Sequence, residues 1–255
     1  MTTLATDTRR PMELGDVNSL PVIASDIIYE GAAVGDNGSG YARPLVAGDP
    51  FRGFAESRAD NASGSAGDVR VRVMDKGKIE LSISGLAITD VGRPVFASDD
   101  ATFTLVAATN TYIGKVIRYV SSGVGVVAFD ASEGPRFTHM DVPVTLANVA
   151  DGDLITTVTP GFHGWVEKME FIVTSPVTTG SKASTLNLEV GTTNATGGTL
   201  ALTSANCTPL GKVVAQAADF TAGNSFTASD TLSIEAASTT TFVEGAGVLR
   251  LTLGY

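Results

Sequence analysis

The feature that most constrains this chain is the alternation of apolar and polar residues in short segments along its length. The segment GLAITDVGRPVFASDDATFTL, residues 85–105, is typical, because apolar residues fall at alternate positions and Gly-Arg-Pro and Asp-Asp interrupt them. A period of two places apolar side chains on one face of a strand, and the branched Cβ of Val and Thr packs well on a pleated sheet. Gly, Asn, Asp and Pro supply the turns between strands. The sequence therefore predicts an all-β fold.

The region from residue 20 to residue 130 has short strands at regular spacing, which is typical of a small β-barrel or β-sandwich. We expect seven to nine strands here, and one short helical turn at residues 87–91. Three of the strand pairs are predicted as hairpins, at residues 69–83, 92–105 and 112–130. In the first hairpin the expected turn is Asp75-Lys76-Gly77.

A break in composition follows at residues 131–136, ASEGPR, where Gly134-Pro135 is a strong interruption of regular structure. Of the 17 Lys and Arg residues, 13 precede position 137 and 4 follow it. We therefore divide the chain into an extended N-terminal arm (1–19), a first β-domain (20–130), a linker (131–136) and a second domain (137–255).

The second domain shows about eight strands with long turns, which predicts a β-sandwich of jelly-roll type. In the segment WVEKMEFIVT, strict alternation places Trp165, Met169 and Phe171 on one face of the strand.

The apolar residues of the arm have no clear period of 2 or 3.6. Arg9-Arg10-Pro11 is a basic segment within the arm that we expect to be extended. Two interpretations remain open: a disordered terminus, or an arm that becomes ordered on a neighbouring subunit.

Charge and cysteine content exclude several classes of function. The net charge is −10 and the pI is about 4.6, whereas a protein that binds nucleic acid through its phosphates needs a basic face. Cys207 is the only cysteine, so no intramolecular disulfide can form, which favours folding in a reducing cytoplasm. The N-terminus lacks the apolar core of a signal peptide, and no apolar run reaches the ~20 residues of a membrane span. We expect neither nucleic acid nor a membrane as a partner.

Few residues in the chain could carry chemistry. The only histidines are His139 and His163, whereas a zinc site needs three or four ligands. No Gly-x-Ser-x-Gly motif precedes His163 to suggest a catalytic triad. The aspartates at 151–153 and 99–100 are interpreted as turn residues rather than ion ligands. The sequence therefore predicts no catalytic, cofactor-binding or metal-binding residue, and a protein that is not an enzyme.

The first domain resembles a known family in a long ordered pattern. A Gly-led strand precedes FRGFAE…DN…G, then come a VRV…G segment, GLAITDVGRPVFASDD and a closing IGKVIRYV. This pattern resembles the capsid cement, or head-decoration, proteins of tailed bacteriophages over residues of about 20–130. The second domain, with ITTVTPGFHGWVEKMEFIVTSP and TLNLEVG, resembles β-domains appended to phage head proteins.

The resemblance implies a structural virion protein that is made in the host cytoplasm. It implies a homotrimer on the outer surface of the expanded capsid, bound to the major capsid protein at three-fold or quasi-three-fold positions. There it would stabilise the shell against internal DNA pressure. Expected capsid contacts are Arg9, Arg10, Pro11, Arg93 and Pro94. An alternative is a binding module, displayed on the capsid or tail, that recognises host-surface or environmental glycans through loops such as GTTNATGGT, residues 191–199 of the second domain.

Overall fold

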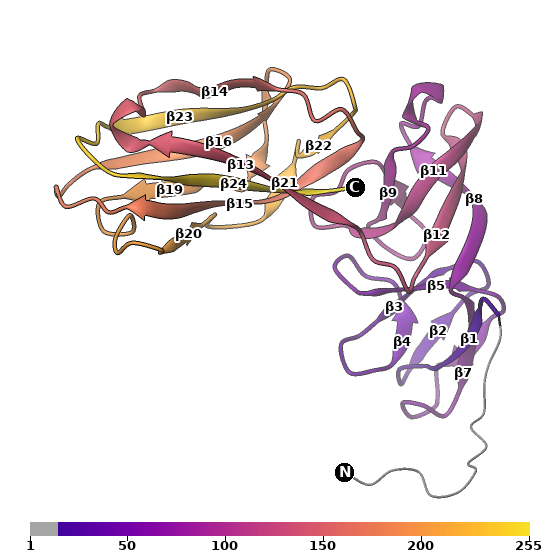
Figure 1. The fold of residues 1–255 in the computed structure, drawn as a ribbon. Helices are drawn as coiled ribbons and strands as arrows, with labels where there is room; N and C mark the ends of the chain where they lie inside the picture. Colours follow the sequence, from indigo (N-terminus) through magenta and orange to yellow (C-terminus); the bar gives the residue numbers. More distant parts are fainter. Residues whose placement is uncertain (1–14) are drawn as a thin grey trace, which may run out of the picture.

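The computed structural model describes residues 15–255, apart from the side chain of Thr156. This part of the chain contains strands β1–β24 and two single turns of 3-10 helix, η1 (Ile88–Asp90) and η2 (Leu146–Asn148), and no α-helix. Within it, no helix has the length and apolar character to cross a membrane. The predicted all-β class is confirmed, with a barrel followed by a sandwich (Figure 1).

The N-terminal half contains twelve strands rather than the seven to nine predicted, because several are only two to four residues long. They are β1 (Val17–Pro21), β2 (Asp26–Ile28), β3 (Ala33–Asp36), β4 (Ala42–Pro44), β5 (Phe51–Ala55), β6 (Ala59–Asn61), β7 (Arg70–Met74), β8 (Lys76–Ser84), β9 (Pro94–Ala97), β10 (Phe103–Thr104), β11 (Thr111–Ser121) and β12 (Val124–Asp130). The first of these, β1, begins at Val17, inside the segment that the sequence assigned to the arm.

These strands form a sheet and a closed barrel. The sheet has the order β1-β7-β5-β3-β4, and the short pair β2–β6 lies beside it. The barrel has the order β10-β8-β12-β11-β9 and closes because β10 pairs with both β8 and β9. Phe54 of β5 packs edge to face on Phe129 of β12, with ring centroids 4.9 Å apart. Part of the sheet therefore shares an apolar core with the barrel, whereas Val34, Val71 and Val73 belong to a separate core.

The predicted hairpins at residues 92–105 and 112–130 are confirmed, as β9–β10 and β11–β12, but the one at residues 69–83 is wrong. Strand β7 pairs with β1 and β5, whereas β8 pairs with β10 and β12, so the chain passes from the sheet into the barrel at Asp75 without reversing. Gly77 resembles a turn residue in the sequence, yet it lies within β8. A Cβ there would lie 3.3 Å from Met74 Sδ and 3.4 Å from the Phe129 ring, so a larger residue would press on these two side chains.

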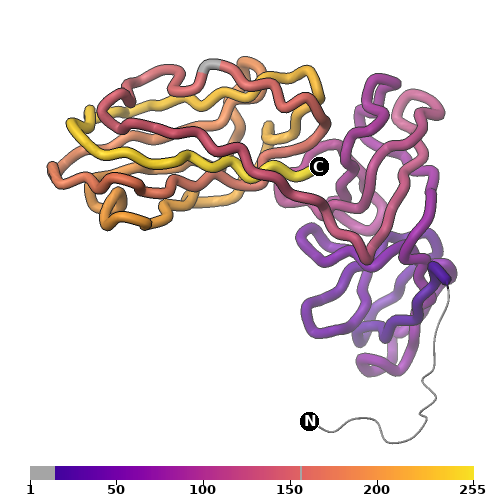
Figure 2. Tube along the Cα trace, viewed as in Figure 1, coloured from indigo at the N-terminus to yellow at the C-terminus, as the bar shows by residue number. Residues whose placement is uncertain are grey.

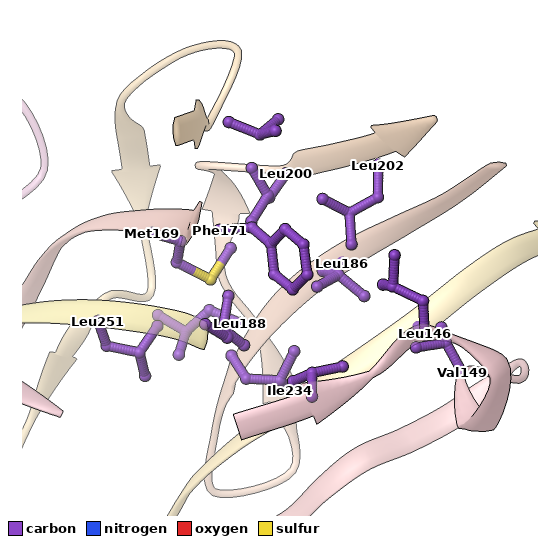
Figure 3. Close-up of a cluster of buried hydrophobic side chains, with 14 of the residues drawn as sticks. Leu146, Val149, Met169, Phe171, Leu186, Leu188, Leu200, Leu202, Ile234 and Leu251 are labelled. Carbon is purple, nitrogen blue, oxygen red and sulfur yellow. The ribbon is translucent and has the colours of Figure 1, made fainter. Parts of the chain in front are cut away.

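The C-terminal half is a sandwich of two antiparallel sheets with the orders β13-β24-β15-β20 and β14-β23-β16-β17. Twelve strands occur here instead of about eight, again because short ones were not foreseen: β13 (Phe137–Thr145), β14 (Gly152–Val158), β15 (Gly164–Ser175), β16 (Ala183–Val190), β17 (Thr193–Asn194), β18 (Thr196–Gly197), β19 (Leu200–Thr203), β20 (Val213–Ala215), β21 (Phe220–Ala222), β22 (Ser225–Phe226), β23 (Leu232–Thr240) and β24 (Ala246–Gly254). Leucines, Met169 and Phe171 from both sheets interdigitate in the core (Figure 3).

A β-bulge in β15 changes which face Trp165 occupies. The register with β24 shifts between Val166 and Lys168, so Val166 joins Met169 in the sandwich core. Trp165 instead lies in a separate cluster with residues of the N-terminal half. The predicted shared face for Trp165 and Met169 is therefore wrong, because one extra residue reverses the alternation.

The chain passes between the halves once, through residues 131–136, which carry no strand, and its C-terminus returns to the same place (Figure 2). Arg136 and Tyr255 exchange two backbone hydrogen bonds, of 2.9 and 3.2 Å. The end of the chain is thereby fixed beside the start of β13.

Proline lies on the open edge of β13. Hydrogen bonds from Arg136 to Tyr255 and from Leu146 to Gly245 continue the ladder with β24, so the even-numbered residues of β13 bond to β24. Odd-numbered residues alternate with them and direct their backbone N–H and C=O outward. Pro143 occupies one of these outward positions, where its missing N–H interrupts the row that another strand would bind.

The sheet of the N-terminal half is protected at both edges in the same way. The ladder bonds of β1 to β7 use even-numbered residues, which leaves Ser19 and Pro21 outward. The N–H of Ser19 donates to the Asn18 side chain, and the Arg70 guanidinium donates to the Ser19 carbonyl. Pro44 faces outward from β4 at the opposite edge.

Gly53 provides a first testable prediction. It has φ +121° in β5, and a Cβ there would collide with the backbone carbonyl of Met74. Replacing Gly53 with Ala should lower the free energy of unfolding by about 2–5 kcal/mol in urea titrations. Two costs contribute, because an alanine is strained at this φ and its Cβ overlaps the Met74 carbonyl. The matched control is Gly31→Ala, since Gly31 has φ +81° but open space around it. Its expected loss is only about 1–2 kcal/mol; equal losses at the two positions would contradict the steric argument.

Candidate functional site

Four aromatic rings join the two halves. The Trp165 ring of β15 lies 5.0 Å from the Phe96 ring of β9 and 5.8 Å from the Tyr112 ring of β11, measured between centroids. Phe137, the first residue of β13, packs edge to face on Trp165 at 6.0 Å. Gly254 borders the indole closely, so any side chain there would displace it.

Polar contacts surround this cluster. The backbone N–H of Ala107 donates to Ser225 Oγ at 3.1 Å, and that of Ala108 donates to Asn224 Oδ1 at 3.4 Å. On the other side, Lys115 Nζ lies 5.4 Å from the centre of the Tyr255 ring, within the range of a cation–π contact. The two halves are therefore held by rings and hydrogen bonds from several elements.

A cleft of about 620 Å³ opens beside the ring cluster, between the halves. Tyr112, Phe137 and Trp165 contribute aromatic wall, and the linker contributes Ala131 and Gly134-Pro135. Trp165 is 3% exposed, whereas Phe137 is 48% exposed. The cleft therefore has an apolar floor and an open rim.

Carboxylates dominate the charge of this cleft, and its lining contains no Lys or Arg from residues 15–255. Three of its five acidic side chains pair with a neighbouring cation, in the pairs Asp49–Arg43, Asp130–Lys76 and Glu133–Arg136. The Lys76 ammonium and the Ser132 hydroxyl lower the pKa of Asp130 to about 2. Glu167 accepts a hydrogen bond from Trp165 Nε1 at 2.7 Å. Glu167 and Asp219 form no ion pair within the described part of the chain, so the cleft favours a cationic ligand.

His163 lies at a second contact between the halves. Its ring packs on Gly92, where a Cβ would lie 3.4 Å from His163 Cδ2. His163 Nδ1 and Arg93 Nε are both buried with no hydrogen-bond partner among the described residues. Burial and then the positive charge of Arg93 lower the pKa of His163, while Asp90 and Asp230 oppose this shift. Burial therefore favours the neutral form of His163 in the folded protein.

We predict that this contact weakens in acid. Because the folded-state pKa of His163 lies below its ordinary value of 6.5, the unfolded state binds the proton more readily. Stability should be lost as pH falls below about 6.5 and should level off below the folded-state pKa. Melting temperatures measured between pH 7.5 and 5 should fall less steeply in His163→Gln than in the wild type. His139→Gln is the control, because His139 is exposed on β13; the same slope in all three proteins would refute the assignment.

An exposed apolar surface covers part of the barrel. Register shifts in β11 make Ile117 and Val120 the extra residues of two bulges, and their side chains are 41% and 43% exposed. The hydrogen bond from Gly92 N–H to Val116 C=O places Val91 beside Ile117. Ile88 of η1 is 68% exposed, the highest value among the large apolar residues of the described chain. We call Ile88, Val91, Ile117 and Val120 the barrel patch.

Of the aspartates considered as ion ligands, Asp99 serves a turn, whereas Asp151 accepts a hydrogen bond from the distant strand β23. Asp99 Oδ1 accepts hydrogen bonds from the backbone N–H groups of Ala101 and Thr102, and Asp151 Oδ1 accepts one from Thr239. Among residues 15–255, no group of three or more His, Cys, Asp or Glu side chains is arranged to hold a metal ion.

The structure separates the residues that the sequence proposed as capsid contacts. Arg9, Arg10 and Pro11 lie outside the described residues. Pro94 is buried at the start of β9, and Arg93 forms a 2.9 Å ion pair with Asp90 at the contact between the halves. Because Pro94 is buried, it has little surface that a partner could contact. The capsid contacts expected of Arg9, Arg10, Pro11, Arg93 and Pro94 stay a prediction.

The barrel patch was missed in the sequence, although a signal is present there. In TYIGKVIRYVS, two apolar residues, Val116 and Ile117, stand side by side and break the alternation. Such a break is what a bulge produces. The cleft left no comparable signal, because its lining residues come from distant segments.

Comparisons of the chain with protein-family models, with curated proteins and with solved structures found no match. The resemblance to capsid cement proteins therefore rests on the sequence pattern alone.

Proposed function

We propose that this chain is a structural virion protein that binds the outer surface of an expanded phage capsid as a trimer and stabilises the shell. The major capsid protein is its partner, at three-fold or quasi-three-fold positions, and it carries out no catalysis. The proposal joins the sequence resemblance to one structural observation, which is the barrel patch.

The barrel patch supports this function because it exposes aliphatic side chains in the half that resembles cement proteins. Exposed apolar residues that gather on neighbouring segments of a soluble protein are a feature of interaction surfaces. Burying such residues across a seam between capsid subunits would oppose separation of those subunits. A protein that binds only the expanded shell stabilises that state.

The proline residues at the sheet edges are consistent with a protein held at high density on a shell. Pro21, Pro44 and Pro143 each interrupt an outward-facing row of backbone groups. Because neighbouring copies cannot readily join through these edges, association is left to specific surfaces.

The test begins with the mass of the purified chain in solution, where a trimer of the 26.2 kDa chain is expected. The protein is then mixed with expanded capsids that were assembled without it from the major capsid protein encoded alongside it. We expect binding and a higher melting temperature of the capsids. A monomer that ignores these capsids would refute the proposal.

A matched pair of variants tests the barrel patch directly. Ile88→Asp should reduce capsid binding at least tenfold, because a charge would be buried in an apolar contact. Leu210→Asp is the control, since Leu210 is 66% exposed in the C-terminal half, against 68% for Ile88. Equal binding by both variants would show that the patch does not contact the shell.

The alternative role in glycan recognition finds less support. Part of the segment GTTNATGGT forms the short strands β17 and β18, and the Asn194 side chain donates to Glu235 at 3.1 Å. Glycan binding through this segment stays a prediction.

A further inference from the structure

We propose that the cleft between the halves is the docking site of the chain's own N-terminal segment, with the guanidinium groups of Arg9 and Arg10 as the ligands. The proposal concerns the free protein and does not depend on capsid binding. It is carried by the charge and shape of the cleft and by the place where the described chain begins.

The described chain begins close to the cleft. Asp16 C=O accepts a 2.8 Å hydrogen bond from Asp75 N–H, and Asp75 C=O accepts a 2.7 Å bond from Ala131 N–H. Ala131 lines the cleft. Arg10 precedes Asp16 by six residues, and an extended chain spans about 3.3 Å per residue. Arg10 can therefore lie up to about 20 Å from Asp16, which is enough to enter a cleft that starts two hydrogen bonds away.

The charges of the two parts are complementary. Glu167 and Asp219 are the cleft carboxylates without an ion pair in residues 15–255, and both side chains are exposed. Arg9 and Arg10 are the only Lys or Arg residues before position 43. A guanidinium group binds a carboxylate through two parallel hydrogen bonds and also stacks on aromatic faces. Phe137 offers such a face at the open rim.

The covalent connection strengthens a contact that would be weak between separate molecules. Exposed ion pairs contribute little alone, but a short linker gives the tethered segment a high effective concentration. We expect about tenfold protection of the segment rather than permanent burial.

The test uses the full chain and measures amide hydrogen exchange in residues 1–14. The wild type should exchange about tenfold more slowly than the cleft variant Glu167→Gln/Asp219→Asn. Adding 0.5 M salt should remove this difference, because it shortens the Debye screening length to about 4 Å. The control variant Glu30→Gln/Glu80→Gln removes two exposed carboxylates that do not line the cleft, and should exchange as the wild type does.

A second measurement follows trypsin cleavage after Arg9 in the full chain. Cleavage should be slower in the wild type than in Glu167→Gln/Asp219→Asn, because a docked segment is less accessible to the protease. Equal exchange and equal cleavage rates in the wild type and the cleft variant would overturn the proposal. Protection that rises with protein concentration would also overturn it, because the segment would then dock on a second copy.

Discussion

Replacing Trp165 with Ala is expected to uncouple the two halves of the molecule. The indole is 3% exposed and contacts Phe96, Tyr112 and Phe137, so its removal leaves a cavity at the junction. Truncating a buried Trp costs about 3–5 kcal/mol. Calorimetry should show a lower melting temperature, with the transitions of the two halves separating further than in the wild type. Small-angle X-ray scattering should show a broader range of distances, because the halves are no longer held together.

Phe171→Ala is the matched control for this experiment. Phe171 is fully buried in the sandwich core and its loss is of similar size, about 3–5 kcal/mol, but it has no part in the junction. This variant should lower the transition of the C-terminal half while leaving the wild-type scattering profile intact. If Trp165→Ala also kept that profile, the ring cluster would not be what joins the halves.

The sequence predicted the fold where local signals decide it. Alternation with Gly, Asn and Asp turns was enough for the β9–β10 and β11–β12 hairpins, since both strands and the turn lie in one segment. The 69–83 hairpin failed because Asp75-Lys76-Gly77 has the composition of a turn, whereas pairing with β1, β5 and β12 determines the path. Long-range pairing is not encoded in the residues of the segment itself, and the β15 bulge at Val166–Lys168 likewise depends on its partner strand.

The candidate surfaces could be predicted only in part, for the same reason. The Val116-Ile117 doublet was visible as a break in alternation, but only the fold brings Ile117 beside Val91 in the barrel patch. The cleft brings together residues from both halves and the linker, such as Asp49, Glu133 and Asp219, which are far apart in the sequence. Their proximity follows from the junction at Trp165, and the bulge that directs Trp165 there was not predictable from alternation.

Replacing Pro143 with Thr is expected to make the protein self-associate. In the wild type the outward N–H groups of Phe137, His139 and Asp141 have no hydrogen-bond partner in residues 15–255, and Pro143 ends that row. Threonine would restore the missing N–H and extend the row to Thr145. Two copies could then pair antiparallel along β13, and two added hydrogen bonds of about 0.5–1.5 kcal/mol each would raise the association constant roughly 10- to 100-fold. Sedimentation velocity should show species larger than the wild type that grow with concentration.

Val142→Thr is the control, because the N–H of Val142 already points to β24 and the variant gains no outward donor. It should sediment as the wild type does. Adding His139→Pro to Pro143→Thr removes a central outward N–H and should reverse the association, since proline blocks an edge wherever its nitrogen faces outward. If Pro143→Thr sedimented as the wild type at every concentration, the exposed edge of β13 would not be what Pro143 protects. Association would then be limited by the twist of the strand or by the charge of the −10 chain.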